Sequence, residues 1–237
     1  MFHVKQLQGK AMNSVLDNFS VEQRKLLDLH LQSVIEENKI TNLTRIVDWD
    51  TAKILHVEDS LVGVPFINEA PQGDYLDMGT GGGFPGLPIA IVTGRKTVLA
   101  DSVGKKIAAL NRIISKLNLG SIVSTFNGRI EELAQERPES FSVITARALS
   151  SLSSLLELAS PLLIRGGILV CYKSQNIEEE LDHAKKVSDT FGMAYGTTEK
   201  ITLSDGETHR SLIVFEKVSE PKISLPRRVG MAQKRPY

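Results

Sequence analysis

The 237-residue sequence lacks the features of membrane-spanning, disulfide-rich and cysteine-metal proteins. Its single cysteine, Cys171, excludes an internal disulfide and a cysteine-based zinc site. No hydrophobic stretch approaches the roughly 18 residues of a membrane span, and residues 1–10 lack the apolar core of a secretory signal. These absences predict a cytoplasmic protein that uses no metal and no membrane.

The chain also has no excess of charge, since 28 basic residues balance 28 acidic ones. A global basic field that would attract nucleic acid is therefore missing, although a local patch can still act. One such patch is the segment 224–237, which contains Arg227, Arg228, Lys234 and Arg235 and no acidic residue. Hydrophobic residues make up 41% of the chain, enough for one large core and an appendage.

The spacing of apolar residues divides the chain into three parts. Residues 1–72 form a predicted helical extension, with a capping box at Ser20 and Gln23 before a helix that reaches Asn38, and a second helix over 48–64. From residue 73 to 218, short apolar runs alternate with helical segments. The predicted strands are 75–79, 97–101, 121–126, 141–146 and 167–173; the predicted helices are 85–92, 105–117, 130–135, 152–163 and 177–190. Residues 219–237 form a basic and irregular tail.

This alternation predicts an α/β fold with a doubly wound, Rossmann-like sheet. Most of its strands are expected to be parallel. The last two runs, 193–200 and 211–218, predict an antiparallel hairpin at one edge.

A glycine-rich loop follows the first predicted strand, with five glycines among the eight residues from Gly79 to Gly86. Glycines let a ligand approach the backbone, and the following helix presents free N–H groups. Asp77 would repel a pyrophosphate but suits the amino group of a methionine moiety. Asp101, 22 residues after Gly79, suits ribose hydroxyls, as it also would in an NAD site. No Gly-Lys-Ser/Thr follows, so a P-loop is excluded. The loop predicts S-adenosyl-L-methionine as the cofactor; NAD and a plain turn are the alternatives.

The segment from Asp77 to Ala90, Asp-Met-Gly-Thr-Gly-Gly-Gly-Phe-Pro-Gly-Leu-Pro-Ile-Ala, resembles the bacterial RsmG family, also called GidB. That family consists of guanine-N7 methyltransferases of the small-subunit (16S) ribosomal RNA. Further segments resemble the same family: Asn42–Thr44, His56–Leu61, Asp101–Lys106, Ala146–Ala148 and Arg165–Lys173.

The resemblance implies a class I methyltransferase that transfers a methyl group to N7 of a guanine, with small-subunit ribosomal RNA or an assembling small subunit as its partner. It also implies cofactor contacts at matching positions, namely Gly79, Phe84, Ile130, Glu131 and Arg147. With the loop and the next strand, the predicted cofactor contacts are Asp77, Gly79, Gly81, Gly83, Phe84, Asp101, Ile130, Glu131 and Arg147. The protein is expected to act as a monomer.

Guanine N7 carries a lone pair and no proton, so the reaction requires no general base. Arg147 is predicted to orient the cofactor or guanine O6; an ion pair with Asp77 or Glu131 is the alternative. The predicted RNA contacts are basic residues: Lys173, Arg227, Arg228, Lys234 and Arg235. Three other functions stay open: methylation of a small molecule or protein, NAD-dependent oxidoreduction, and non-catalytic RNA binding in assembly.

Overall fold

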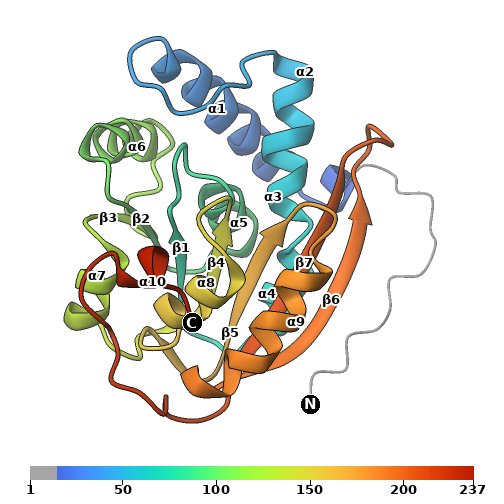
Figure 1. Cartoon of the computed structure of the whole chain (residues 1–237). Helices are drawn as coiled ribbons and strands as arrows, with labels where there is room; N and C mark the ends of the chain where they lie inside the picture. The colour runs from blue at the N-terminus through green and yellow to red at the C-terminus, as the bar shows by residue number, and fades with distance from the viewer. Residues whose placement is uncertain (1–14) are drawn as a thin grey trace.

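A computed structural model describes residues 15–237, so the first fourteen residues of the predicted extension lie outside the described part. Its centre is a seven-stranded sheet of order β3-β2-β1-β4-β5-β7-β6 (Figure 1). The strands are β1 (Asp74–Met78), β2 (Thr97–Asp101), β3 (Val123–Asn127), β4 (Phe141–Arg147), β5 (Leu163–Lys173), β6 (Met193–Thr202) and β7 (His209–Lys217). β1 to β5 are parallel, and β7 runs antiparallel to both β5 and β6. The predicted α/β fold and edge hairpin are confirmed.

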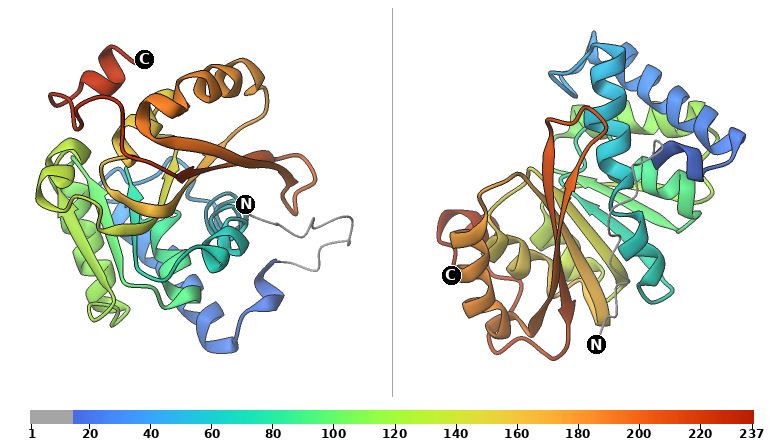
Figure 2. Two further views of the ribbon diagram at one scale, coloured as in Figure 1. Left: turned by 90° about the horizontal axis from the view of Figure 1, so that it is seen from below. Right: turned by 90° about the vertical axis from the view of Figure 1, so that its right-hand side faces the viewer.

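Helices cover both faces of the sheet because successive strand residues point to opposite sides (Figure 2). Tyr75 and Leu99 pack into one core, and Leu76 and Val98 into the other. The first core includes η1 (Val15–Asn18), α1 (Val21–Asn38), α2 (Trp49–Ala52), η2 (Lys53–Glu58), α3 (Asp59–Leu61), α4 (Val64–Glu69), α5 (Gly86–Thr93) and α6 (Gly104–Lys116). The second includes α7 (Ile130–Glu136), α8 (Leu152–Ala159), α9 (Glu178–Val187), η3 (Ser188–Phe191) and α10 (Met231–Lys234). Over residues 15–237, no helix is both long and apolar enough to span a bilayer.

The N-terminal helices differ in how closely they follow the sequence pattern. The capping box at the start of α1 forms as predicted, with Ser20 Oγ accepting from the Gln23 backbone N–H at 3.2 Å. The second predicted helix is interrupted: a π-helical segment, η2, separates α2 from α3. Such π turns are uncommon and are frequently found at functional sites. Here the segment contributes His56 and the Leu55 carbonyl to the carboxyl edge of the sheet, as described below.

The predicted helix 152–163 is wrong at its end, because α8 stops at Ala159 and β5 already begins at Leu163. Pro161 has no N–H to continue the helix, and the apolar pair Leu162 and Leu163 fits a buried strand as well as a helix. Leu163 pairs with Phe141 of β4. The tail is also more ordered than predicted, since α10 forms and Ala232 is buried against α8.

Candidate active site

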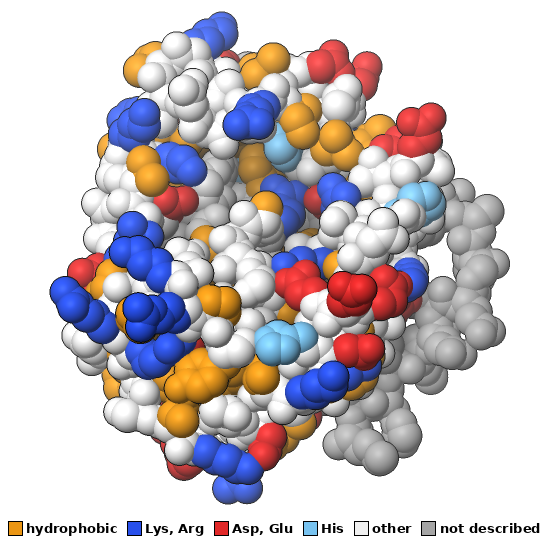
Figure 3. Space-filling view, viewed as in Figure 1, with side chains coloured by type: hydrophobic (Ala, Val, Ile, Leu, Met, Phe, Trp, Pro, Cys, Tyr) orange, Lys and Arg blue, Asp and Glu red, His pale blue; other side chains and the backbone are white. Residues whose placement is uncertain are grey.

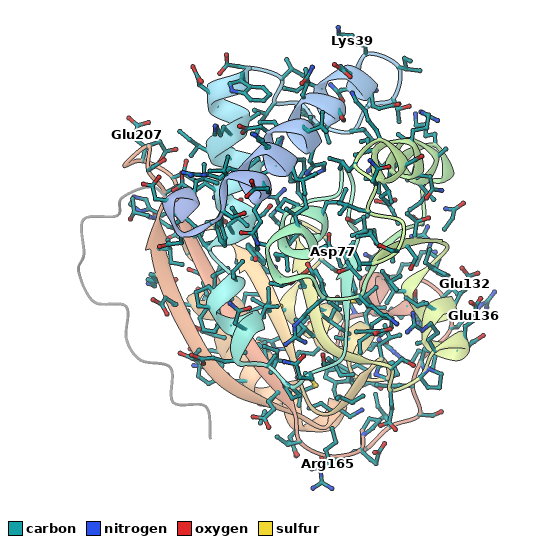
Figure 4. The ribbon with its side chains drawn as sticks, turned by 180° about the vertical axis from the view of Figure 1, so that it is seen from behind. Lys39, Asp77, Glu132, Glu136, Arg165 and Glu207 are labelled. Atoms are coloured by element: carbon teal, nitrogen blue, oxygen red, sulfur yellow. The ribbon has the colours of Figure 1, made fainter. Side chains whose placement is uncertain are left out.

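The glycine loop leaves β1 where the strand order reverses between β1 and β4, the place where doubly wound sheets bind ligands. Asp77 lies behind this loop, fully buried (Figure 4). Its carboxylate accepts from the Gly86 N–H at 2.9 Å and from Thr145 Oγ1 at 2.8 Å, and burial raises its pKa to about 6. One oxygen of Asp77 thus holds the start of α5 and the other is bonded to β4, so the carboxylate supports the loop. Its predicted contact with a ligand stays a prediction.

A cavity of about 280 Å³ opens beside the loop. Four of the predicted cofactor contacts line it, namely Gly79, Asp101, Ile130 and Glu131. They are joined by residues that sequence reasoning missed: Ala100, Ser102, Val103, Lys106, Gly128, Arg129, Ala148, Leu149, Leu158, Gly230 and Gln233. Glycine is favoured at position 79, since φ is +71° and an added Cβ would lie 2.6 Å from Leu149 Cδ1 and displace that side chain. The loop thus combines a left-handed turn with a wall that has no room for a side chain.

Two carboxylates at this cavity are fixed by backbone N–H groups. Asp101 accepts from Gly81 at 3.1 Å and from Val103 at 2.9 Å. Glu131, in the first turn of α7, accepts from the Gly230 N–H of the tail at 2.6 Å. The cavity therefore presents two oriented carboxylates, which suit the hydroxyls and amino groups of a nucleoside. Lys106 Nζ lies 3.8 Å from Asp101 Oδ2 at the same wall.

Phe84 lies further along the loop, away from this cavity, between two buried histidines. Its ring centroid is 4.5 Å from that of His30 and 4.8 Å from that of His56. His30 Nε2 lies 3.2 Å from the Gly82 carbonyl, and His56 Nε2 lies 2.7 Å from Thr44 Oγ1. Both Nδ1 atoms are buried without a partner in the described chain, so we infer that each Nδ1 is the unprotonated nitrogen. Gly81 and Gly83 likewise lie outside the cavity wall.

Arg147, at the end of β4, pairs with neither Asp77 nor Glu131. Its Nη1 donates to Asp59 Oδ2 at 2.9 Å and to the Leu55 carbonyl at 3.2 Å. Arg210, at the start of β7, donates from Nε to Asp59 Oδ1 at 2.9 Å. Asp59, 1% exposed, thus holds two arginines at the carboxyl edge of the sheet. Basic and histidine side chains are visible in the hollow on this face (Figure 3).

The sequence did not indicate the roles of Asp59 and Arg210, because they lie 151 residues apart. A second link of the same kind joins the same two regions: Glu58 accepts from the backbone N–H of Ser204, in the β6–β7 turn, at 2.8 Å. Nε and Nη2 of Arg147 have no hydrogen-bond partner within residues 15–237. A guanidinium fixed on one side and free on the other can still bind an acceptor.

Two of the predicted RNA contacts are occupied within the protein. Lys173 Nζ donates to the Ser150 carbonyl at 2.7 Å and to Glu180 at 2.8 Å. Arg227 forms a two-point ion pair with buried Glu157. Both charges are paired within the protein, and the contact of these two residues with RNA stays a prediction. Arg228, Lys234 and Arg235 are exposed, and basic side chains gather over α7 and α10 in Figure 3.

No group of histidine, cysteine or acidic residues suited to a metal ion occurs within residues 15–237. The cavity combines two carboxylates, placed to bind a nucleoside, with a glycine loop.

A sequence profile of the family described as rRNA small subunit methyltransferase G (GidB) matches residues 23–209. The chain belongs to this family. A ribosomal RNA small subunit methyltransferase G from Carboxydothermus hydrogenoformans is 35% identical over 92% of this chain and 94% of that protein. One from Pseudothermotoga lettingae is 37% identical over 82% and 84%.

Solved structures share the fold of this RsmG family member at low sequence identity. The O-methyltransferase from Bacillus cereus, solved in complex with SAH, is 16% identical with a TM-score of 0.56, covering 85% of this chain and all of that one. The antibiotic-resistance methyltransferase Kmr is 18% identical with a TM-score of 0.50, covering 61% of this chain and 86% of that one. These similarities support the class I methyltransferase fold.

The buried histidines predict how stability depends on pH. Burial lowers the pKa of His30 to about 4, and burial together with the charge of Arg147 lowers that of His56 to about 4. Between pH 6.5 and 4 the unfolded chain therefore binds two protons that the folded chain does not. Asp77 has the opposite effect: because its pKa is raised, the folded chain binds one proton at this carboxyl group that the unfolded chain does not. The free energy of unfolding is expected to fall on acidification by roughly 1 kcal/mol per pH unit.

Urea unfolding at pH 6.5, 5.5 and 4.5 measures this slope. In the control variant His30→Gln, the amide can still donate to the Gly82 carbonyl but cannot titrate. Its slope should be smaller than that of the unmodified protein by roughly 1.4 kcal/mol per pH unit, because one buried histidine no longer titrates. An unchanged slope in His30→Gln would show that these groups do not govern acid stability.

Proposed function

We propose that this protein methylates N7 of a guanine in 16S ribosomal RNA, forming N7-methylguanosine, with S-adenosyl-L-methionine as the methyl donor. The observation that carries the proposal is the cavity between Gly79, Asp101 and Glu131, in a chain of the rRNA small subunit methyltransferase G family. The proposed partner is the small-subunit RNA, free or in an assembling subunit, and the proposed location is the cytoplasm. We further propose that the protein acts as a monomer.

The residues present fit this cofactor. The cavity has two buried carboxylates, and a glycine whose lack of a side chain leaves the loop backbone open to close approach. Asp101 would hold the ribose hydroxyls, and the Glu131 carboxylate with the Ile130 backbone would hold the adenine. The cofactor supplies an electrophilic methyl group on a sulfonium, and Gly79 allows it to approach the backbone of the loop.

Guanine N7 attacks with its own lone pair, so no residue has to remove a proton. This agrees with the side chains near the loop: His30 and His56 are buried and neutral, and His56 is bonded to Thr44. What the protein contributes is the placement of the guanine, which can supply several kcal/mol and up to roughly 7–11 in well-oriented cases. Arg147, with its free N–H groups, would donate to guanine O6 beside the reacting N7. Arg210 shares Asp59 with Arg147 and would hold it in place.

The decisive experiment maps N7-methylguanine along 16S ribosomal RNA from cells with and without this protein. Purified protein and labelled S-adenosylmethionine should restore the missing mark on RNA from the deleted strain. An unchanged map, together with protein that binds the cofactor, would favour a small-molecule or protein substrate. RNA binding without methyl transfer would favour the assembly factor.

The exposed arginines and lysine of the tail are proposed to contact RNA phosphates. Replacing Arg228, Lys234 and Arg235 together by Gln should weaken RNA binding and lower the slope of log affinity against log salt. Each lost phosphate contact reduces that slope by roughly 0.7–0.9. Filter binding between 50 and 200 mM salt measures it. Arg165→Gln is the control, since Arg165 is exposed at the opposite, amino-terminal edge of the sheet (Figure 4); an equal effect of this control would refute the assignment.

A further inference from the structure

The last segment of the chain forms part of the cofactor cavity. After β7 the chain returns across the second helical layer and ends near α8 and α10 (Figure 1). Gly230 and Gln233 line the cavity together with Gly79 of the glycine loop. The Gly230 N–H donates to Glu131 Oε1 at 2.6 Å, while Oε2 has no partner within residues 15–237. The tail therefore orients this carboxylate and leaves one oxygen for a ligand.

The tail is fixed to α8 at two positions one helical turn apart. Ser154 Oγ donates to the Ala232 carbonyl at 2.6 Å. Glu157 accepts from Arg227 Nε at 2.6 Å and Nη2 at 2.5 Å, in a two-point geometry. The same guanidinium donates to the Arg235 carbonyl at 2.9 Å and lies 4.6 Å from the Tyr237 ring. Arg227 thus connects the helix to both ends of the last eleven residues.

Glu157 makes this attachment specific. Its side chain is 3% exposed, and within residues 15–237 Arg227 is its single partner. A buried carboxylate is strongly unfavourable without its counter-charge, so the tail has one position that satisfies it. If the tail moved away, Glu157 would lose its partner, Glu131 would lose the Gly230 N–H, and the cavity would lose one wall.

We propose that residues 225–237 are a strap that completes the adenosine side of the cofactor cavity, and that Arg227 is a positioning residue for cofactor binding. It acts through Gly230 on Glu131, whose Oε2 would accept a hydrogen bond from the amino group of the purine. This rests on the proposed function, because it assumes an S-adenosyl ligand in the cavity. In this proposal Arg227 acts within the protein, through its pair with Glu157.

The test measures the Kd of S-adenosylhomocysteine by calorimetry for Arg227→Gln and Glu157→Gln. Arg227→Gln leaves the Glu157 carboxylate buried without its counter-charge, which can destabilise the fold. Glu157→Gln breaks the same ion pair but removes the buried charge, so it separates loss of the ion pair from that destabilisation. Both variants are expected to bind the ligand at least tenfold more weakly. In methyl transfer, the KM for the cofactor should rise by the same factor, while kcat at saturating cofactor stays within about twofold. Lys222→Gln is the control. Lys222 lies in the same tail and makes an exposed ion pair with Asp189 of η3. The Kd of S-adenosylhomocysteine for this variant should stay within about twofold of the wild-type value.

Hydrogen exchange of the unmodified protein gives a second measurement that needs no variant. The ligand is expected to slow amide exchange in 226–236 as well as in 128–136. If the wild type does not bind S-adenosylhomocysteine, the cofactor assignment fails. If it binds while exchange in the tail is unchanged, or Arg227→Gln binds equally well, the strap is refuted and the cofactor assignment stands.

Discussion

Gly79→Ala is expected to lower the affinity for S-adenosylhomocysteine by on the order of 10- to 100-fold, the equivalent of the 1–3 kcal/mol typical of overpacking. The new methyl group would meet Leu149, and both residues line the cavity. Moving Leu149 away would reshape the wall against which the ligand packs. Calorimetric titration with the ligand measures the loss.

Gly94→Ala separates this effect from backbone strain. Gly94 has a φ of +67°, close to the +71° of Gly79, and no atom would lie within 4 Å of an added Cβ. Both alanine variants should lose roughly 1 kcal/mol of stability for the left-handed conformation, and Gly79→Ala should lose more because its methyl group meets Leu149. Only Gly79→Ala should lose ligand affinity. Equal affinities for the two variants would mean that the cofactor does not lie against the loop.

Arg147→Gln is expected to lower kcat/KM for methyl transfer by on the order of 100-fold, the size of effect that misplacement of a reactant produces. The side chain does not line the cofactor cavity, so the Kd of S-adenosylhomocysteine should stay within about threefold. The fold should tolerate the change, because Asp59 keeps its bond to Arg210. Single-turnover methylation of unmodified 16S ribosomal RNA, with calorimetry alongside, gives both quantities.

Arg165→Gln again serves as the matched control for removal of one arginine, and it should leave both quantities unchanged. Arg147→Lys is informative as well, since lysine keeps the charge but not the planar set of donors. If Arg147→Gln raises the Kd of S-adenosylhomocysteine by the same factor as it lowers kcat/KM, Arg147 belongs to the cofactor site and the guanine assignment is wrong.

The sequence was most informative where one local pattern governs the structure. The capping box at Ser20, the strand Thr97–Asp101 and the glycine loop all follow from neighbouring residues. The end of α8 was mispredicted because an apolar pair such as Leu162 and Leu163 fits either kind of element. Tertiary pairing with β4 decided between them.

The site was predicted less completely than the fold, because most of its contacts join distant segments. Asp101, predicted from its place at the end of a strand, and Glu131, implied by the family resemblance, both line the cavity. Asp59 with Arg210 and Gly230 with Glu131 pair residues 151 and 99 positions apart. No local pattern indicates such pairs. A carboxylate beside a glycine loop can bind a ligand or hold the loop, and no local pattern indicated the bonds of Asp77 to Gly86 and Thr145.

The shared core on the first face of the sheet has a practical consequence for anyone who shortens this protein. Leu27, Leu31 and Val34 of α1 pack in the same cluster as Leu87 and Leu110, which lie between them and the strands. A chain starting near residue 73 would expose the apolar side chains of α5 and α6 that α1 covers, and it is expected to aggregate. Helix α1 is therefore an integral part of the methyltransferase core, and a truncated protein should keep it.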